Sequence, residues 1–542
     1  MGQARELEVK ELESPKGATS AAQAIFHSLI LIFLVLSGGC ATFRAGGGGV
    51  LQEEIDQIVS TPPLDQVNWG IRIVDPERGQ ILYSRHAHLK FIPASNMKLL
   101  STATALSLLG PDYRYQTEFF GVGSFEEGGR VLDGDLLLRA GGDPTLSQRF
   151  YPSAEAPLDS LAEGLWAAGV QTVTGSLVVD VSTWDSTSVP GSWMVQNLSG
   201  TSGATGGAFS IAEGVLTVEI TAGEEEGSPA HARWWPSLGD ESISVEFVTV
   251  HPDSSTRGRS IEYLPESRRL ELGGKIRVGE VDTIRVSQRD PVRLASAALV
   301  RALARRGIEI QGGTRIAWDL GEPVGPESCT TGRRPGSKAT PDIPLQNLET
   351  SEAPLQECLD ATRITGLTSP RMSEVVQAIL EPSQNWMTEQ LVRTLGSELG
   401  QEGSWREGFR IEQEFLTQEV GVDSLDIIFR DGSGMSTQNL VTPRAIVRIL
   451  DYMRASSNSG IFRNALASPG EEESTLRNRL SSLESRVFGK TGTLTHVTSL
   501  SGYVFTDSGR ELIFSILTNG SGLSSGVVRA GIDRVTEAIA RH

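Results

Sequence analysis

PASNMKLLSTATALSLLGP, residues 93–111, is an apolar segment with a serine and a lysine near its start. A proline at the beginning and Gly-Pro at the end predict a helix between them. Because the segment is apolar almost all round, we expect this helix to be buried. Ser95 and Lys98 are three residues apart, which places both side chains on one helix face with Cβ atoms roughly 5–6 Å apart.

An S-x-x-K pair of this kind can supply a nucleophile and its base. A serine hydroxyl attacks poorly until a neighbouring base takes its proton. Lysine can be that base when burial and nearby positive charge, here the helix N-terminus, lower its pKa. Of the seven lysines, only Lys98 has a serine three residues before it. Alone the pair is a weak signal, because such a serine is often a helix cap.

A second motif, Lys490-Thr491-Gly492-Thr493, lies in VFGKTGTLTHVTSLSGYV, residues 487–504. This segment predicts an edge strand followed by another strand. Gly492 would let a substrate backbone lie against the strand, while the lysine and threonine meet a carboxylate. In isolation the same residues fit a glycine-marked turn beside a surface lysine.

A third motif, Ser383-Gln384-Asn385, stands at a predicted junction between a loop and a helix. By itself it is typical of a serine that caps a helix. S-x-x-K, S-x-N and K-T-G nevertheless occur in this order along the chain, and acyl-serine transferases that react with β-lactams use this set. The combination predicts a serine enzyme of that type.

With these motifs the chain resembles the class C low-molecular-mass penicillin-binding proteins, the D-alanyl-D-alanine carboxypeptidase/endopeptidases. Further matching segments run from about residue 65 to about residue 520; they include LGPDYRYQTEFF, GDLLLRAGGDPTL (134–146), GSLVVD with Trp184 following, and DGSGMSTQNLVTP (431–443). The resemblance therefore covers nearly the whole mature chain.

The resemblance implies an α+β fold. A penicillin-binding transpeptidase/β-lactamase-like domain, with an antiparallel sheet flanked by helices, would be interrupted by a large insertion of two small β-rich domains. The residues support this independently, because 116–316 contain many short alternating runs between Gly, Pro, Asp and Ser, with one clear helix near 291–306. Residues 68–84 further predict a β-hairpin.

These patterns divide the chain into five parts. We expect a signal or lipoprotein segment with a Gly-rich tether, a first part of the transpeptidase-like domain, inserted β-rich domains, a flexible Pro-, Gly- and Thr-rich insert, and a second part of the transpeptidase-like domain, at 1–49, 50–115, 116–316, 317–368 and 369–542 respectively. Cys329 and Cys358 fall in the flexible insert, where they could form a disulfide in an exported protein or stay unpaired.

The resemblance also implies which residues carry the reaction. Ser95 would attack the D-Ala-D-X carbonyl and form an acyl-enzyme, with Lys98 as its base. Ser383 would relay the proton toward the leaving amine, and Asn385 would hold the substrate amide. No residue is identified that orients the deacylating water.

The K-T-G motif would contribute most of the substrate binding. The resemblance implies that Lys490 and Thr491 bind the terminal carboxylate beside Gly492. The backbone N–H groups of Ser95 and Thr493 would form an oxyanion hole, worth about 3 kcal/mol per donor.

Two positions depart from relatives that recognise a diaminopimelate side chain. Those relatives use an aspartate shortly after a Gly-Trp element and an arginine in a DGSGLSR segment. Alignment on Trp193 puts Asn197 at the first position, and alignment on DGSG puts Thr437 at the second. We therefore expect weaker selectivity for a free diaminopimelate end.

The N-terminus resembles an export signal. AIFHSLILIFLVL, residues 24–36, has the length of a signal-peptide apolar region and is too short to span a membrane comfortably. Cys40 follows small residues, as in a bacterial lipobox, although Ser37 stands where an aliphatic residue is usual. We expect an exported, periplasmic protein, anchored to a membrane by lipid on Cys40.

Composition excludes several other classes. The formal charge of −19 argues against nucleic acid as a partner, since phosphate binding needs clustered Lys and Arg. Neither a CxxC pair nor an HExxH pattern occurs, so we expect no metal site and no cofactor. The expected partners are peptidoglycan stem peptides, with β-lactam antibiotics as covalent inhibitors.

Two rival functions share the motifs. A serine β-lactamase uses the same three, but the large insertion and the additional matching segments argue against it. A catalytically silent penicillin-binding envelope protein is the other rival, and the intact motif residues argue against that.

Overall fold

The computed structural model describes residues 48–126, 128–204, 206–236, 243–255, 258–264, 269–318 and 361–542. Val50–His542 form one compact unit, distinct from Met1–Gly49. The predicted signal segment with Cys40, and the predicted pair Cys329 and Cys358, lie outside the described residues. Among the helices of the described ranges, none has the length and apolar character needed to span a bilayer.

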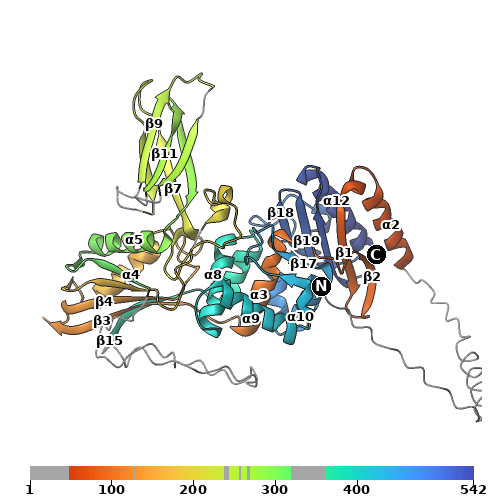
Figure 1. Ribbon diagram of the computed structural model, residues 1–542, viewed down its shortest axis with the longest axis horizontal. Coiled ribbons are helices and arrows are strands. Elements are labelled where there is room, and N and C mark those ends of the chain that lie inside the picture. Colours follow the sequence, from red (N-terminus) through yellow and green to blue (C-terminus); the bar gives the residue numbers. More distant parts are fainter. Residues whose placement is uncertain are drawn as a thin grey trace, which may run out of the picture. The chain divides into compact units, whose positions relative to one another are not determined.

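A five-stranded antiparallel sheet combines strands from residues 68–85 with strands from residues 487–519 (Figure 1). Its order is β18 (Val487–Leu494), β19 (Val497–Phe505), β20 (Glu511–Asn519), β1 (Asn68–Asp75) and β2 (Gln80–Arg85). The hairpin predicted over 68–84 is β1 and β2, and β18 is an edge strand as its sequence predicts.

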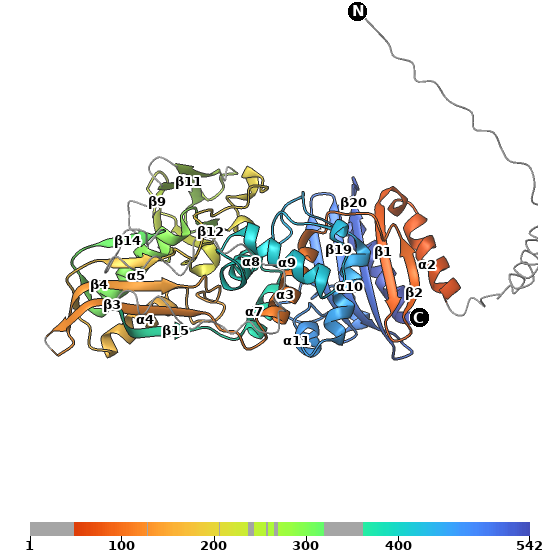
Figure 2. The same cartoon turned by 60° about the horizontal axis from the view of Figure 1, so that its bottom comes forward.

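Helices cover both faces of this sheet, as Figures 1 and 2 show. On one face α2 (Gly48–Ser60) and α12 (Ser525–Arg541) pack through Ile55 and Ile532 in a shared apolar cluster. A second cluster on the other face holds the buried helix α3 (Met97–Leu108) among the other helices of this domain, α7 (Met372–Leu380), α8 (Asn385–Leu399), α9 (Trp405–Gln418), α10 (Pro443–Ala455) and α11 (Ser459–Asn464). A two-stranded ladder of β16 (Ile427–Ile428) and β17 (Leu440–Val441) lies between α9 and α10 in the chain.

The insertion between α3 and α7 contains two β-rich bodies, each with its own apolar cluster. The first is a seven-stranded sheet with α4 (Ala156–Ala167) and α5 (Pro291–Arg306); its strands are β3 (Gln116–Glu126), β4 (Val131–Ala140), β5 (Thr172–Val173), β6 (Leu177–Asp180), β13 (Glu309–Ile310), β14 (Thr314–Ala317) and β15 (Ala361–Thr368).

The second body of the insertion is built from two three-stranded sheets. They are ordered β12 (Val281–Ser287), β7 (Val215–Thr221), β8 (His231–Trp235) and β10 (Arg259–Leu264), β11 (Arg269–Arg277), β9 (Ile243–Val250). Ile284 and Phe247 come from different sheets and share one apolar cluster, so the two sheets pack face to face. The predicted α+β architecture, an antiparallel sheet flanked by helices with two inserted β-rich domains, is confirmed.

One boundary of the predicted insert is wrong. Residues 361–368 were expected to be flexible, but they form β15, which pairs antiparallel with β3 over Ala361–Thr368. Their sequence, ATRITGLT, is rich in Thr and contains Gly, so the apolar alternation that marks a strand is weak. Strand formation here depends on the backbone of a partner that lies more than 200 residues earlier in the chain.

Candidate active site

Ser95 lies in a tight turn directly before α3. The turn spans Ala94–Asn96, and Ala94 adopts a left-handed conformation with φ of 49°. Two glycines from other segments press against this turn. A Cβ on Gly434 would lie 1.8 Å from the Ala94 carbonyl oxygen, and one on Gly492 would lie 2.9 Å from Ser95 N. Both positions therefore require a residue without a side chain.

The turn is also tied to the edge of the central sheet by hydrogen bonds. Asn96 Nδ2 donates to the Lys490 carbonyl at 3.0 Å and to Ser499 Oγ at 2.8 Å. Ser499 Oγ in turn donates to the Pro93 carbonyl at 2.8 Å. These buried contacts hold the predicted nucleophile and the predicted carboxylate-binding strand in one position.

Lys98 is fully buried behind Ser95. Its amine donates to Ser95 Oγ at 2.9 Å and to Asn385 Oδ1 at 2.7 Å. A third hydrogen bond, of 2.8 Å, goes to the Ser433 carbonyl. Burial lowers the pKa of Lys98 to about 7, against the opposing effect of two buried carboxylates nearby. A lysine with this pKa can give up its proton at neutral pH.

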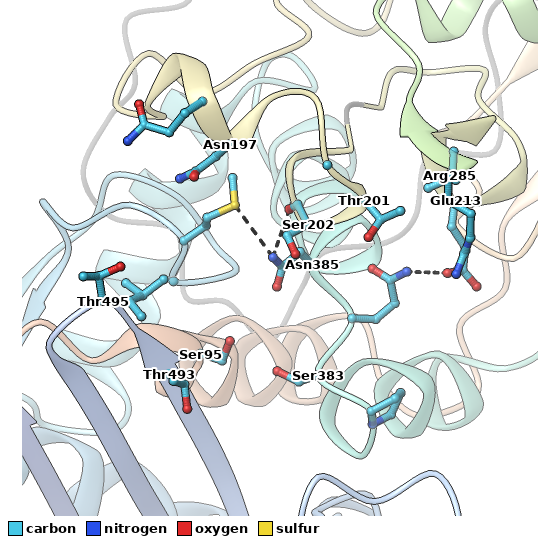
Figure 3. Close-up of a pocket in the computed structure, with 18 of the residues that line it drawn as sticks. Ser95, Asn197, Thr201, Ser202, Glu213, Arg285, Ser383, Asn385, Thr493 and Thr495 are labelled. Carbon is cyan, nitrogen blue, oxygen red and sulfur yellow. Dashed lines mark hydrogen bonds between the residues drawn. The ribbon is translucent and has the colours of Figure 1, made fainter. Parts of the chain in front are cut away.

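The S-x-N motif meets the S-x-x-K motif through Asn385, the first residue of α8. Its Oδ1 accepts from Lys98, and its Nδ2 donates to the carbonyl of Ser202 at 3.0 Å. Ser202 belongs to the insertion, so an inserted loop reaches the predicted substrate-binding amide. Ser383 has a left-handed φ of 67°, and Figure 3 shows its hydroxyl directed toward Ser95.

The K-T-G motif lies on β18. Lys490 is fully buried, and its amine donates to the Thr491 carbonyl at 3.0 Å. Burial, assisted by the positive charge of Lys98, lowers the pKa of Lys490 well below its usual value. Thr491 Oγ1 donates to Thr475 Oγ1 at 2.8 Å. Thr493 is exposed and lines the cavity in front of Ser95.

A cavity of about 670 Å³ opens over these residues (Figure 3). Ser95, Ser383, Asn385 and Thr493 line one part of it. The insertion supplies another part of its wall, which includes Asn197, Thr201, Ser202, Glu213, Val215 and Arg285. The cavity thus combines residues of all three motifs with residues of the insertion.

The two positions expected to govern side-chain selectivity differ in location. Asn197 lines the cavity. Thr437 is exposed, and the described lining of the cavity does not include it. The segments that carry them do meet, because Trp193 Nε1 donates to Asp431 Oδ2 at 2.8 Å.

Comparison with known proteins decides the family. The model of the D-Ala-D-Ala carboxypeptidase 3 (S13) family matches residues 51–320 and 348–541. The chain belongs to this S13 family. The predicted resemblance to penicillin-binding carboxypeptidases is therefore confirmed.

Two related sequences and one solved structure agree with this family assignment. A D-alanyl-D-alanine carboxypeptidase of Actinomadura sp. (strain R39) is 29% identical over 520 residues, which cover 93% of this chain and 88% of the relative. The D-alanyl-D-alanine carboxypeptidase DacB of Haemophilus influenzae is 20% identical over 456 residues, covering 84% and 85%. The crystal structure of penicillin binding protein 4 from H. influenzae shares the fold, with a TM-score of 0.72 and 19% identity over 90% of this chain and 99% of that one.

Sequence reasoning missed a buried carboxylate of this S13 chain, Glu389, one helical turn after Asn385. It accepts hydrogen bonds from Gly432 N at 3.1 Å, Ser433 N at 2.8 Å and Trp405 Nε1 at 2.7 Å. Burial, with the nearby charge of Asp431, raises the pKa of Glu389 to about 7. The sequence offered one signal of this residue: Glu389 follows Asn385 by four positions, which places both side chains on the same helix face.

Asp431 is the second missed residue. In the sequence it is the first residue of the DGSG segment, and its carboxylate holds that loop together by hydrogen bonds. It accepts from Trp193 Nε1 at 2.8 Å, Gly434 N at 2.7 Å and Asn439 Nδ2 at 2.6 Å. Through Gly434 this loop contacts the Ser95 turn, so Asp431 helps to hold that turn in place.

Proposed function

We propose that the protein is a serine D-alanyl-D-alanine carboxypeptidase in which Ser95 forms an acyl-enzyme with peptidoglycan stem peptides. The contact that carries this proposal is the 2.9 Å hydrogen bond between Lys98 Nζ and Ser95 Oγ. Together with a Lys98 pKa of about 7, it pairs a nucleophile with a base that works at neutral pH. Membership of the S13 family supports the substrate class.

The first half of the reaction follows from this pairing. Neutral Lys98 takes the proton of Ser95, whose oxygen attacks the carbonyl between the two D-alanines. The backbone N–H groups of Ser95 and Thr493 stabilise the oxyanion, at about 3 kcal/mol per donor. Ser383, whose hydroxyl points toward Ser95, carries the proton to the amine of the departing D-alanine. Water then releases the acyl group.

Substrate binding uses the same elements. The terminal carboxylate meets Lys490 and Thr491, while Gly492 leaves room for the substrate backbone along β18. Asn385 holds the substrate amide with the second N–H of Nδ2, the first being donated to the Ser202 carbonyl. A substrate whose leaving group is an amine of a neighbouring stem peptide would make the reaction an endopeptidase cleavage. Purified muropeptides with and without crosslinks separate these two activities by their products.

β-Lactams are proposed as covalent inhibitors of the same serine. Their strained amide presents a carbonyl and a carboxylate in the arrangement that Ser95, Lys490 and Thr491 would receive. The H. influenzae penicillin binding protein 4 has been crystallised in complex with a novel β-lactam, and it shares this fold with a TM-score of 0.66.

One experiment separates the proposal from its rivals. The protein and a Ser95→Ala variant are incubated with labelled penicillin, and the adduct is followed over time. A stable adduct that depends on Ser95 is expected. Rapid release would identify a β-lactamase, and absence of labelling in both proteins would identify a silent penicillin-binding relative.

Export to the periplasm and lipid anchoring through Cys40 complete the proposal. A peptidoglycan enzyme must reach the cell wall, and the apolar segment before Cys40 is of signal-peptide length. Radiolabelled palmitate should enter the wild-type protein and not a Cys40→Ala variant. Labelling of both proteins, or of neither, would contradict lipidation at this residue.

A further inference from the structure

A row of three side chains crosses one sheet of the insertion beside the active-site cavity. Arg285 on β12 is the register partner of Thr217 on β7, and Thr217 is the partner of Trp235 on β8. Directly paired residues of antiparallel strands point to the same face. Ile284 and Trp234, their chain neighbours, pack into the apolar cluster on the opposite face. The row therefore faces outward.

The row continues the cavity that contains Ser95. A second cavity of about 430 Å³ is lined by Thr217, Trp235 and Arg285. Val215 and Arg285 belong to the walls of both cavities, so the two cavities meet at these residues. Figure 3 shows Arg285 at the far side of the first cavity from Ser95. A substrate longer than a dipeptide can thus run from Ser95 past Arg285 to Trp235.

Arg285 places an unpaired positive charge in the wall of the joined cavities. Its guanidinium is exposed and makes no hydrogen bond or ion pair with any residue that the structure describes. The other charged side chains of the first cavity's wall neutralise each other, since Arg149 Nε lies 3.0 Å from Glu213 Oε1. Gln384 Nε2 donates to the second oxygen of Glu213. Among the described residues of this wall, Arg285 is therefore the one cation without a partner, in a protein whose formal charge is −19.

Trp235 offers the complementary apolar surface. Its side chain is 38% exposed, which is unusual for so large an aromatic ring. A flat ring exposed in a polar groove can pack against the C–H face of a sugar, since that face of a pyranose is apolar. A guanidinium, by contrast, binds a carboxylate with two hydrogen bonds.

We propose that the row Arg285–Thr217–Trp235 binds the glycan-proximal part of a muropeptide, with Arg285 on the free carboxylate of the stem glutamate and Trp235 on a sugar ring. The inference rests on the proposed function, which sets the D-Ala-D-Ala end at Ser95. From that end a stem peptide presents first the scissile bond, then the glutamate carboxylate, then the sugar. The joined cavities present Ser95, Arg285 and Trp235 in the same order.

The carboxylate contact is tested by a cycle of two ligands and two proteins. Binding of a disaccharide-pentapeptide to a Ser95→Ala protein is measured by calorimetry, with the stem glutamate either free or amidated. In the Ser95→Ala protein that retains Arg285, amidation of the glutamate should weaken binding on the order of ten-fold, because it removes one charge-assisted hydrogen bond. With Arg285→Gln the two ligands should bind alike. Arg233→Gln is the matched control, because Arg233 is exposed on β8 and paired with Glu219.

The sugar contact is tested in the same way. Removing the disaccharide from the pentapeptide should weaken binding several-fold in the protein that retains Trp235 and should change binding little in Trp235→Ala. Trp235→Phe should restore most of this difference between the two ligands. A folding defect would instead weaken the binding of both ligands alike. Trp318→Ala is the control, because Trp318 is exposed to the same degree, 39%, and lines a different cavity.

The outcomes are distinct. The assigned site would be overturned if amidation weakened binding equally with Arg285 and with Arg285→Gln. It would also be overturned if removal of the disaccharide weakened binding equally with Trp235 and with Trp235→Ala. Penicillin labelling of the wild-type protein is recorded in parallel. If that labelling fails while the ligand cycles hold, the proposed reaction is wrong and the muropeptide site stands.

Discussion

The indole N–H of Trp193 donates to Oδ2 of Asp431 at 2.8 Å, so a residue of the insertion is joined to the loop that carries Gly434. Asp431 also accepts from the backbone N–H of Gly434 at 2.7 Å. Gly434 in turn presses against the turn that holds Ser95. The insertion therefore supports the turn that holds Ser95 and also forms part of the cavity wall.

Replacing Trp193 by Phe tests this support. The change keeps the six-membered ring of the indole and removes its N–H, and with it one buried hydrogen bond to a carboxylate, which is worth about 1.5–3 kcal/mol. We expect a lower melting temperature and slower acylation of Ser95 by labelled penicillin. Trp318→Phe, on an exposed residue, should change neither. Unchanged acylation by the Trp193 variant would show that the contact does not position the serine.

The acylation rate should depend on the charge of Lys98. Because its pKa is about 7, the base is protonated and inactive below that pH, and the rate should rise through pH 7 to a plateau. Stopped-flow acylation between pH 5 and pH 9 measures this.

Lys98→Arg places a cation that cannot lose its proton at this position. It should slow acylation by about 10²–10⁴-fold and remove the rise with pH. Lys90→Arg, at an exposed lysine, is the control. A wild-type rate that is flat from pH 5 to pH 9 would exclude Lys98 as the base.

Gly434→Ala should disable the site sterically. The new Cβ would lie 1.8 Å from the Ala94 carbonyl oxygen, and the φ of 83° disfavours alanine. We expect destabilisation of about 1–3 kcal/mol and loss of penicillin labelling. Gly460→Ala, where a Cβ meets nothing within 4 Å, should retain both stability and labelling. Normal labelling of Gly434→Ala would mean that the turn tolerates displacement.

Glu412 on α9 should make stability depend on pH. Burial raises its pKa to about 8, with the Ser101 hydroxyl opposing the shift. Between about pH 4.5 and pH 8 the unfolded chain loses this proton while the folded protein keeps it, so stability falls as pH rises. The slope is at most about 1.4 kcal/mol per pH unit for one group.

Glu412→Gln removes this titration. Urea unfolding at pH 5 and pH 8 should show a smaller loss of stability in the variant than in the wild type. Glu414→Gln, whose side chain is 49% exposed on the same helix, should keep the wild-type dependence. Parallel curves for wild type and Glu412→Gln would rule out a protonated Glu412 in the folded state.

Selectivity for a free diaminopimelate end should be weak. The resemblance to the family implies that Asn197 and Thr437 stand where relatives that recognise this end have a charged pair, and of the two residues Asn197 lines the cavity. A diaminopimelate-bearing peptide should be cleaved no better than its lysine or capped analogue. A large preference for it, measured as kcat/KM, would contradict this expectation.

Much of the site follows from short-range patterns in the sequence. Ser95 lies in the turn that leads into α3 and Lys98 lies in the first turn of α3, so their contact depends mainly on a spacing of three residues. The glycine at position 492 indicates that β18 is an edge strand. The order of the three motifs then predicts their assembly. The strand β15 was missed because its Thr-rich alternation becomes stable only beside β3.

Other contacts had no local signal. Ser202 and Asn385 are 183 residues apart, and a carbonyl group carries no information about its partner in the sequence. Arg285 and Trp235 come together through the strand register of the insertion, which alternation alone leaves open. Such long-range pairings require the folded backbone.

The hydrogen bond from Asn385 to Ser202 has an energetic consequence for substrate binding. The Ser202 carbonyl accepts from Asn385 Nδ2 at 3.0 Å before any peptide arrives, so the Asn385 side chain is already held in place. The Nδ2 group carries two N–H bonds, and the proposed complex uses the second one for the peptide. The amide is therefore oriented in advance, and a binding peptide loses little free energy in ordering this side chain.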